Sequence, residues 1–305
     1  MTIEWPTNFP TEEDMKDILK ETITTVWRID LTVTEIDEWL NNFCGKVYSK
    51  EDERRLALWL LCNFTYYNEQ EVNQLCKQLY KKLIHDIALT GQITNQEELE
   101  EVLGKTYFSA IGQAGESGAM ILYFFRQEAN LSIHKFVYPT AFPEGKECIR
   151  VFIDDVTLSG TTAIRFFKER KESLDCKKAY YLTLFATIDA VNELSKLGVS
   201  TLYCTLLDER DKVFSDKSMI YSKFPELRKP SYEMAYAYGQ EIMKEYPFMK
   251  DYPLGFKNGE LCFGFHYNIP NNTLPIFWAQ RNWMPILQRK EKVYGKKEAI
   301  LDKYI

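Results

Sequence analysis

The strongest signal in the sequence is Val151-Phe152-Ile153-Asp154-Asp155-Val156-Thr157-Leu158-Ser159-Gly160-Thr161-Thr162. Its apolar start predicts a buried strand. The strand is followed by two acids, a hydroxyl-rich turn and then the start of a helix. Ligands of open parallel sheets bind at the carboxyl ends of the strands, and the two acids fall at such an end. Paired carboxylates there accept hydrogen bonds from a vicinal diol, or hold a divalent ion bound to the diol.

The turn after the two acids has the chemistry of a phosphate site. Successive backbone N–H groups and side-chain hydroxyls converge on the start of a helix, and a helix N-terminus attracts anions. Acids that bind ribose hydroxyls, together with a loop that binds a phosphate, would fit a ribose 5-phosphate moiety. The alternative is an ordinary strand, turn and helix with a capping serine, but adjacent acids at the end of a buried strand are costly without partners.

A second signal is a cluster of glycines in a chain that has only 14 of them. Gly112, Gly115 and Gly118 lie close together, after an expected strand at 106–111 and before an expected helix at 119–127. Glycine is needed where the backbone approaches a ligand closely. A tight turn that holds no ligand is the alternative interpretation.

The remaining pattern predicts an α/β protein with a parallel sheet. Residues 1–104 are expected to form a helical N-terminal region, with capped helices that begin near Thr11, Ser49, Asn68 and Gln96. Residues 105–305 are expected to form the sheet domain, with a C-terminal hood from about residue 208. The further strands are predicted at 133–138, 148–153, 178–186, 199–207 and 259–267, and the further helices at 162–171, 189–197 and 232–246.

The composition excludes several classes of protein. Hydrophobic residues make up 45% and aromatic residues 14% of the 305, which excludes a disordered chain, and the net charge of −6 argues against a generic DNA-coating protein. The sequence shows neither an apolar run of ~20 residues nor a signal peptide, so we expect a cytoplasmic protein without a membrane span. The seven cysteines form no Cys-x-x-Cys pair, which predicts reduced thiols rather than a zinc site.

Residues 151–162 resemble the phosphoribosyl-pyrophosphate (PRPP) signature of type I phosphoribosyltransferases. The order of the glycine loop and the acid pair also resembles that fold. The resemblance implies that Asp154 and Asp155 hold the ribose hydroxyls directly or through Mg²⁺, and that catalysis at ribose C1 depends on them. It further implies pyrophosphate contacts from Gly115, Glu116, Ser117 and Gly118, and 5′-phosphate contacts from Thr157, Leu158, Ser159, Gly160, Thr161 and Thr162.

Two features depart from that family. Leu158 occupies the position where some of its enzymes carry an aspartate that acts as a base, and the segment at 139–147, with Lys146, is short for a loop that closes over PRPP. Two functions therefore stay open. One is an enzyme that transfers or cleaves at ribose C1, and the other is a catalytically inactive nucleotide sensor or scaffold.

Three segments resemble a divergent phosphoribosyltransferase-like family of bacterial conflict and antiphage systems, including some retrons. They are Leu56 to Phe64, Gly115 to Gly118, and Asn268 to Trp278. This resemblance implies a defence effector whose partner is a reverse transcriptase, a non-coding RNA or another defence protein. The phosphoribosyltransferase-like fold also implies a homo-oligomer.

The C-terminal part offers two further features. Asn271 and Asn272 are expected in a hood that contacts the ligand, with Phe277 and Trp278 stacking on a base. The alternative is a turn that covers an aromatic core contact. The basic end from Arg289 to Lys303 either contacts RNA or is simply solvated.

Overall fold

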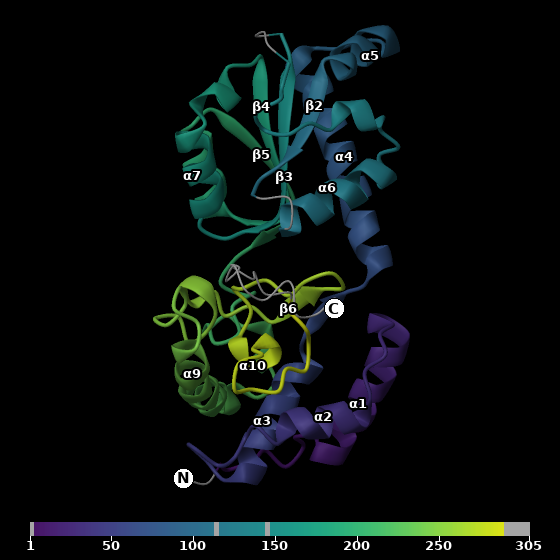
Figure 1. The fold of residues 1–305 in the computed structure, drawn as a ribbon. Coiled ribbons are helices and arrows are strands. Elements are labelled where there is room, and N and C mark those ends of the chain that lie inside the picture. The colour runs from purple at the N-terminus through teal and green to yellow at the C-terminus, as the bar shows by residue number, and fades with distance from the viewer. Residues whose placement is uncertain (1–2, 113–115, 144–146, 290–305) are drawn as a thin grey trace, which may run out of the picture.

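The computed structural model describes residues 3–112, 116–143 and 147–289. One half of the molecule, which we call the sheet lobe (residues 68–207), is built on four parallel strands (Figure 1). Side by side they are β2 (Thr106–Ala110), β3 (Ile149–Thr157), β4 (Lys178–Thr187) and β5 (Val199–Leu207). Because the strands run parallel, their carboxyl ends meet at one edge of the sheet.

Helices cover both faces of this sheet. The connecting helices are α6 (Ser117–Glu128), α7 (Thr161–Glu169) and α8 (Ile188–Ser195). Val151 and Ile153 of β3 point to the face covered by α6 and α4 (Glu69–Gly91), whereas Phe152 between them points to the face covered by α7 and α8. Apolar residues therefore fill both faces of β3, as a central parallel strand requires. The predicted α/β class is confirmed.

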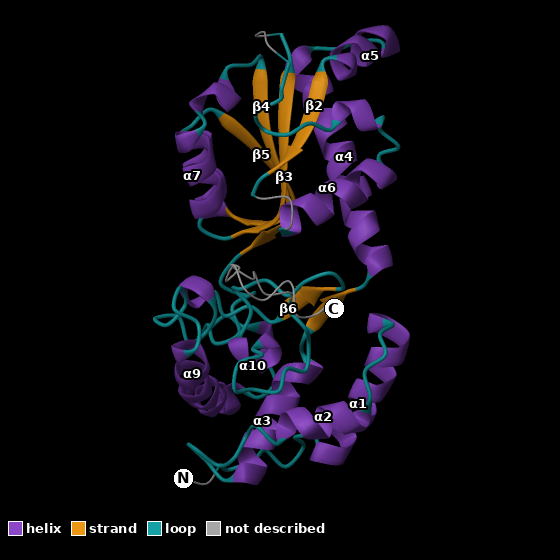
Figure 2. Ribbon diagram, viewed as in Figure 1, coloured by secondary structure: helices purple, strands orange, loops and turns teal. Residues whose placement is uncertain are grey.

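The other half, the helical lobe, combines residues 3–66 with residues 213–287 around one core. Its helices are α1 (Glu12–Thr22), α2 (Val33–Leu40), α3 (Lys50–Cys62), α9 (Arg228–Lys244) and α10 (Pro275–Trp278). A two-stranded parallel sheet of β1 (Thr65–Tyr67) and β6 (Phe263–Phe265) lies between the lobes (Figure 2). Side chains of β6 pack on the sheet-lobe core, so this small sheet joins the two halves.

The packing divides the chain at places other than the expected boundary at residue 104. The first three helices pack with the C-terminal segment, whereas α4 packs on the sheet and α5 (Gln96–Gly104) lies beside it. Short helical turns complete the fold: η1 (Ile23–Trp27), η2 (Ile133–Lys135), η3 (Lys171–Leu174), η4 (Met219–Tyr221), η5 (Pro225–Leu227) and η6 (Phe256–Asn258).

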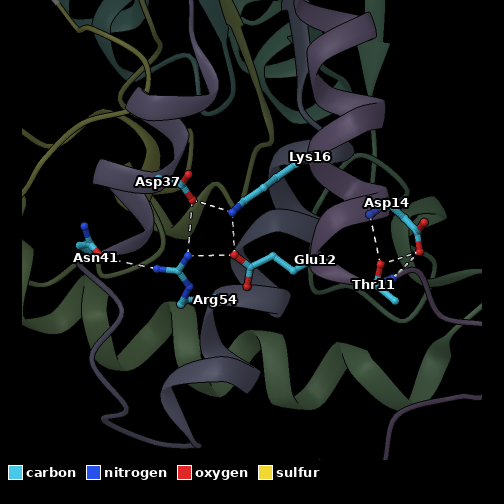
Figure 3. Close-up of polar contacts among 7 residues, drawn as sticks. All are labelled: Thr11, Glu12, Asp14, Lys16, Asp37, Asn41 and Arg54. Atoms are coloured by element: carbon cyan, nitrogen blue, oxygen red, sulfur yellow. Dashed lines mark hydrogen bonds and ion pairs between the residues drawn. The ribbon is translucent and has the colours of Figure 1, made fainter.

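The N-terminal helices are joined by caps and ion pairs (Figure 3). The Thr11 hydroxyl accepts a hydrogen bond from the Asp14 N–H at 3.1 Å, and the Asp14 carboxylate accepts from the Thr11 N–H at 2.9 Å. The predicted capping box of α1 is thus confirmed. Lys16 Nζ lies 2.8 Å from Glu12 Oε1 and 2.6 Å from Asp37 Oδ1, and it links α1 to α2.

Three expected elements differ in the structure. The strand predicted at 133–138 is wrong: residues 133–135 form the turn η2, and Phe136 makes an isolated bridge to Phe108. Ile133 and Tyr138 are 63% and 73% exposed, so this segment lacks the second buried face that a central strand needs. The strand expected at 259–267 shortens to β6, because residues around Asn258 and Glu260 turn with positive φ.

The third difference concerns the acids. Strand β3 extends to Thr157, so Asp154 and Asp155 are among its last residues instead of following the strand. Asp154 is in register with Thr183 of β4. The neighbouring strand therefore fixes the position of this carboxyl group.

Candidate functional site

The two acids lie at the carboxyl end of β3. The Asp155 N–H donates to Asp154 Oδ1 at 2.9 Å, and the Val156 N–H donates to Asp155 Oδ1 at 2.8 Å. The hydroxyl of Tyr181, a buried residue of β4, donates to Asp154 Oδ2 at 3.1 Å. Backbone and tyrosine together hold both carboxyl groups in place, and both line a cleft.

The charged form of these acids is disfavoured. Burial, and then the negative charge of Asp155, raise the pKa of Asp154 well above its usual range. Burial also raises the pKa of Asp155, although hydrogen bonds from the Val156 N–H and other groups oppose the rise. A ligand that donates hydroxyl groups, or a cation that comes with it, stabilises such a pair in its charged form.

The hydroxyl-rich loop connects β3 to α7. Gly160 has φ +65° and precedes the first residue of α7, a left-handed conformation that glycine adopts readily. The side-chain oxygens of Ser159 and Thr161 lie 2.8 Å apart. The Thr187 hydroxyl donates to the Leu158 carbonyl and so ties the loop to β4. Residues 156–162 line a small hollow of about 90 Å³, together with Asp154 and with Phe256, Asn271 and Asn272.

The glycine-rich segment follows β2. Gly112 has φ +98°, and Gly115 lies outside the described residues. A Cβ at Gly118 would lie 2.5 Å from the carbonyl oxygen of Ile111 and 3.2 Å from that of Ile153. The missing side chain at Gly118 allows α6 to begin against the ends of β2 and β3. The group that this glycine approaches closely is therefore the protein backbone and not a ligand. Glu116 and Ser117 line the same cleft as the two acids.

The C-terminal segment closes the other side of the cleft. Residues 267, 268 and 270–272 face the acid pair across a cleft of about 190 Å³. Asn271 and Asn272, which we expected in a hood, therefore line the same cleft as the acid pair. The Asn272 side chain also donates to the Phe256 carbonyl at 3.0 Å, which fixes its orientation.

The expected stacking residues are not at the cleft. Phe277 and Trp278 are fully enclosed in the helical-lobe core, and Phe277 stacks against Trp39. The idea that they stack on a base is wrong, and the alternative of an aromatic core contact is correct. Arg289 lies at the cleft, whereas residues 290–305 fall outside the described residues.

Besides Tyr181, two polar residues contribute to the site that sequence reasoning did not single out. The first is Tyr267, which is 4% exposed, lines the cleft and has a hydroxyl with no hydrogen-bond partner among the described residues. Burial, and then the charge of Asp155, raise its pKa well above the usual range, so the hydroxyl keeps its proton and is a donor. No spacing in the sequence marks this tyrosine among the 19 present.

The second is Lys257. Its ammonium lies 3.0 Å from Ser159 Oγ and 2.6 Å from Thr161 Oγ1, inside the loop between β3 and α7. The sequence does hold a signal for it, because Gly255 and Gly259 flank it in a chain poor in glycine.

The model of the family described as PRTase-CE matches residues 36–289, most of the chain. The chain belongs to the PRTase-CE family. The parallel sheet, the acid pair at the end of β3 and the hydroxyl-rich loop before α7 give this PRTase-CE chain the predicted type I phosphoribosyltransferase-like fold.

Solved structures similar to the PRTase-CE chain are distant. Orotate phosphoribosyltransferase from Aeropyrum pernix is 13% identical, with a TM-score of 0.27, over 35% of this chain and 62% of that one. UMP synthase from Leishmania donovani is 15% identical, with a TM-score of 0.30, over 65% of this chain and 38% of that one. The chain thus spans less than two thirds of the length of either enzyme. A hypothetical protein from Neisseria gonorrhoeae with bound ppGpp is 13% identical, with a TM-score of 0.32, over 47% of this chain and 84% of that one.

No curated protein matches the PRTase-CE chain. In the described ranges, none of its helices combines the length and apolar character that a membrane span needs. No three His, Cys, Asp or Glu side chains gather into a metal-binding group among the same residues.

Proposed function

We propose that the cleft binds a ribose 5-phosphate moiety, as part of PRPP or of a nucleotide, and that the protein transfers or cleaves a group at ribose C1. The observation that carries the proposal is the convergence of the acid pair with the loop at 157–162 on one edge of the sheet. Asp154 and Asp155 would hold the ribose hydroxyls, and the loop would hold the 5′-phosphate. Glu116 and Ser117 would lie near the leaving group.

Magnesium fits this site only together with a ligand. Asp154 and Asp155 supply the hard oxygen donors that Mg²⁺ prefers, but two carboxylates do not complete its six-coordinate shell. Oxygens of a ribosyl pyrophosphate would supply further donors. When bound, the ion would neutralise charge on the leaving pyrophosphate.

The enzyme proposal is tested by turnover. We would incubate the protein with PRPP and Mg²⁺ plus a panel of nucleobases, and separately with nucleotides and RNA, and follow release of pyrophosphate or base by chromatography. The proposal predicts product with wild type and none with the Asp154→Asn/Asp155→Asn variant. A folded wild-type protein that binds PRPP but turns over nothing across the panel would contradict catalysis.

That last result is the one expected from the second candidate function, a nucleotide sensor or scaffold that binds without turnover. Its supporting observation is Leu158, an apolar side chain where a catalytic base would stand, whose Cδ1 would lie 3.1 Å from a Cβ added at Gly259. Leu158 therefore packs toward the C-terminal segment. Thermal stabilisation by PRPP or nucleotides without product formation would favour this function.

The cellular role is also proposed. From the resemblance of residues 56–64, 115–118 and 268–278 we infer a cytoplasmic effector in bacterial antiphage defence, including retron systems. Its partners would be a reverse transcriptase, a non-coding RNA or another defence protein, and the protein would form a homo-oligomer. Purification of the tagged protein from its native host, followed by sequencing of bound RNA and mass measurement of the complex, tests both points. A monomer without RNA or protein partners would contradict them.

A further inference from the structure

The loop between β3 and α7 receives a positive charge from a distant part of the chain. Lys257 belongs to the C-terminal segment, yet its ammonium donates to Ser159 Oγ at 3.0 Å and to Thr161 Oγ1 at 2.6 Å. Hydroxyl oxygens are neutral acceptors, so this placement leaves the lysine's charge without compensation from them. An anion is the partner that such a charge selects.

The contact also prepares the two hydroxyls for a ligand. A hydroxyl whose oxygen accepts from an ammonium must turn its own hydrogen away from that ammonium. One of the two hydrogens is used between Ser159 and Thr161, whose oxygens lie 2.8 Å apart, and the other is left to donate elsewhere. The hollow beside them, of about 90 Å³, is suited to one phosphate group rather than to a whole nucleotide.

The backbone that carries Lys257 is held in an uncommon conformation. Lys257 and Asn258 have φ of +54° and +49°, a region sparsely populated by residues other than glycine. The segment is fixed there by the Phe256 N–H, which donates to the Asn271 carbonyl at 2.7 Å, and by the close approach of Gly255 to Asn272. Such strain persists where the surrounding structure imposes it, and it is common at ligand sites.

We propose that Lys257 is a phosphate-binding residue that sets the preference of the site for 5′-phosphorylated ligands. This inference rests on the proposed ribose 5-phosphate function. The phosphate would be held from the sheet lobe by residues 159–161 and from the C-terminal segment by Lys257, so that a bound ligand bridges the two parts.

The test is calorimetric titration of wild type, Lys257→Gln and Lys257→Arg with ribose 5-phosphate and with PRPP. Lys223→Gln is the matched control, because Lys223 is an exposed lysine that loses the same charge. Lys257 is exposed as well, so its variants should unfold at the wild-type temperature. A hydrogen bond to a charged group predicts affinity for both ligands about tenfold or more weaker in Lys257→Gln, with smaller loss in Lys257→Arg.

Two further readouts separate this role from a general effect. Inorganic phosphate should compete with ribose 5-phosphate in wild type and much less in Lys257→Gln, and salt should weaken binding more steeply in wild type. Lys257→Gln affinity equal to wild type would overturn the inference and leave the proposed function standing. If wild type itself binds neither ribose 5-phosphate nor PRPP, both the inference and the proposed function fail.

Discussion

Two buried carboxylate sites in this molecule are built in opposite ways. Glu53 of α3 is fully enclosed in the helical lobe, and each of its oxygens accepts two hydrogen bonds. The donors are the N–H groups of Gly45, Val47 and Tyr48, and the Tyr238 hydroxyl. Asp154 and Asp155 in the sheet lobe open onto a cleft instead, and burial raises the pKa of both.

This difference indicates that Glu53 stabilises the fold, whereas Asp154 and Asp155 are suited to binding a ligand. Both carboxylate oxygens of Glu53 accept hydrogen bonds from groups of the protein itself, and these bonds stabilise the loop at 44–49. Burial disfavours the charged form of the acid pair, and the hydroxyl of Tyr267, which lines the same cleft, has no hydrogen-bond partner within residues 3–112, 116–143 and 147–289.

The largest expected effect is on Glu53. Replacing it with alanine leaves the N–H groups of Gly45, Val47 and Tyr48, which are buried or partly buried, without their acceptor, so the free energy of unfolding should fall by about 3 kcal/mol or more. Urea denaturation followed by circular dichroism measures the loss. Glu51→Gln, an exposed acid of the same helix, is the control, and an equal small loss in both variants would refute the structural role of Glu53.

The opposite result is expected for Asp154→Asn. Because the pKa of Asp154 is higher in the folded chain, wild type loses stability as the pH rises from about 3.9 toward that raised value, whereas asparagine does not ionise. The variant should therefore gain stability relative to wild type across this range, and the gain should be larger at pH 8 than at pH 5. Denaturation at pH 5 and pH 8 checks the sign. A variant less stable than wild type at pH 8 would place Asp154 with Glu53 as a structural acid.

The variant Tyr267→Phe removes a single hydroxyl oxygen from the cleft. Since the Tyr267 hydroxyl has no partner in the described part of the chain, its removal should leave the free energy of unfolding unchanged or raise it by up to about 1 kcal/mol. The same change should weaken ribose 5-phosphate binding about fivefold, the value of one hydrogen bond. Tyr221→Phe, in the helical-lobe core, should not alter binding. Clear destabilisation by Tyr267→Phe without loss of affinity would contradict a ligand role.

The smallest effect is expected in the ion-pair network of α1, α2 and α3. Burial of Glu12 raises its pKa, but hydrogen bonds from Arg54 and Lys16 (Figure 3) outweigh this effect and lower the pKa of the Glu12 carboxyl group. All three side chains are partly exposed to solvent. Lys16→Ala should therefore cost about 0.5 kcal/mol of unfolding free energy at low salt, and less in 1 M NaCl. A loss as large as that of Glu53→Ala, unaffected by salt, would contradict the contrast.

Local signals made the sheet lobe predictable from sequence. The apolar strands, the acid pair and the loop before α7 are contiguous in the chain, so their order predicted the parallel sheet and one side of the cleft. Asn271 and Asn272, whose amide side chains in a turn-rich segment led us to expect them in a hood, line the cleft in the structure.

The other parts depend on contacts between distant residues. Strand β1 exists because it pairs with β6, almost two hundred residues later, and the short segment Thr65–Tyr67 has no strand pattern of its own. Phe277 and Trp278 read equally well as ligand contacts or as core until the helical lobe encloses them. Lys257 and Tyr267 reach the site only through the folding of the C-terminal segment onto the sheet.

The most direct test of a phosphoribosyl site at this cleft is titration of ribose 5-phosphate and PRPP, with Mg²⁺, into wild type and the Asp154→Asn/Asp155→Asn variant. Circular dichroism establishes that both are folded before the titration. We predict saturable binding by wild type and none by the variant. Equal binding by both proteins, or none by the folded wild type, would contradict the assignment of the cleft.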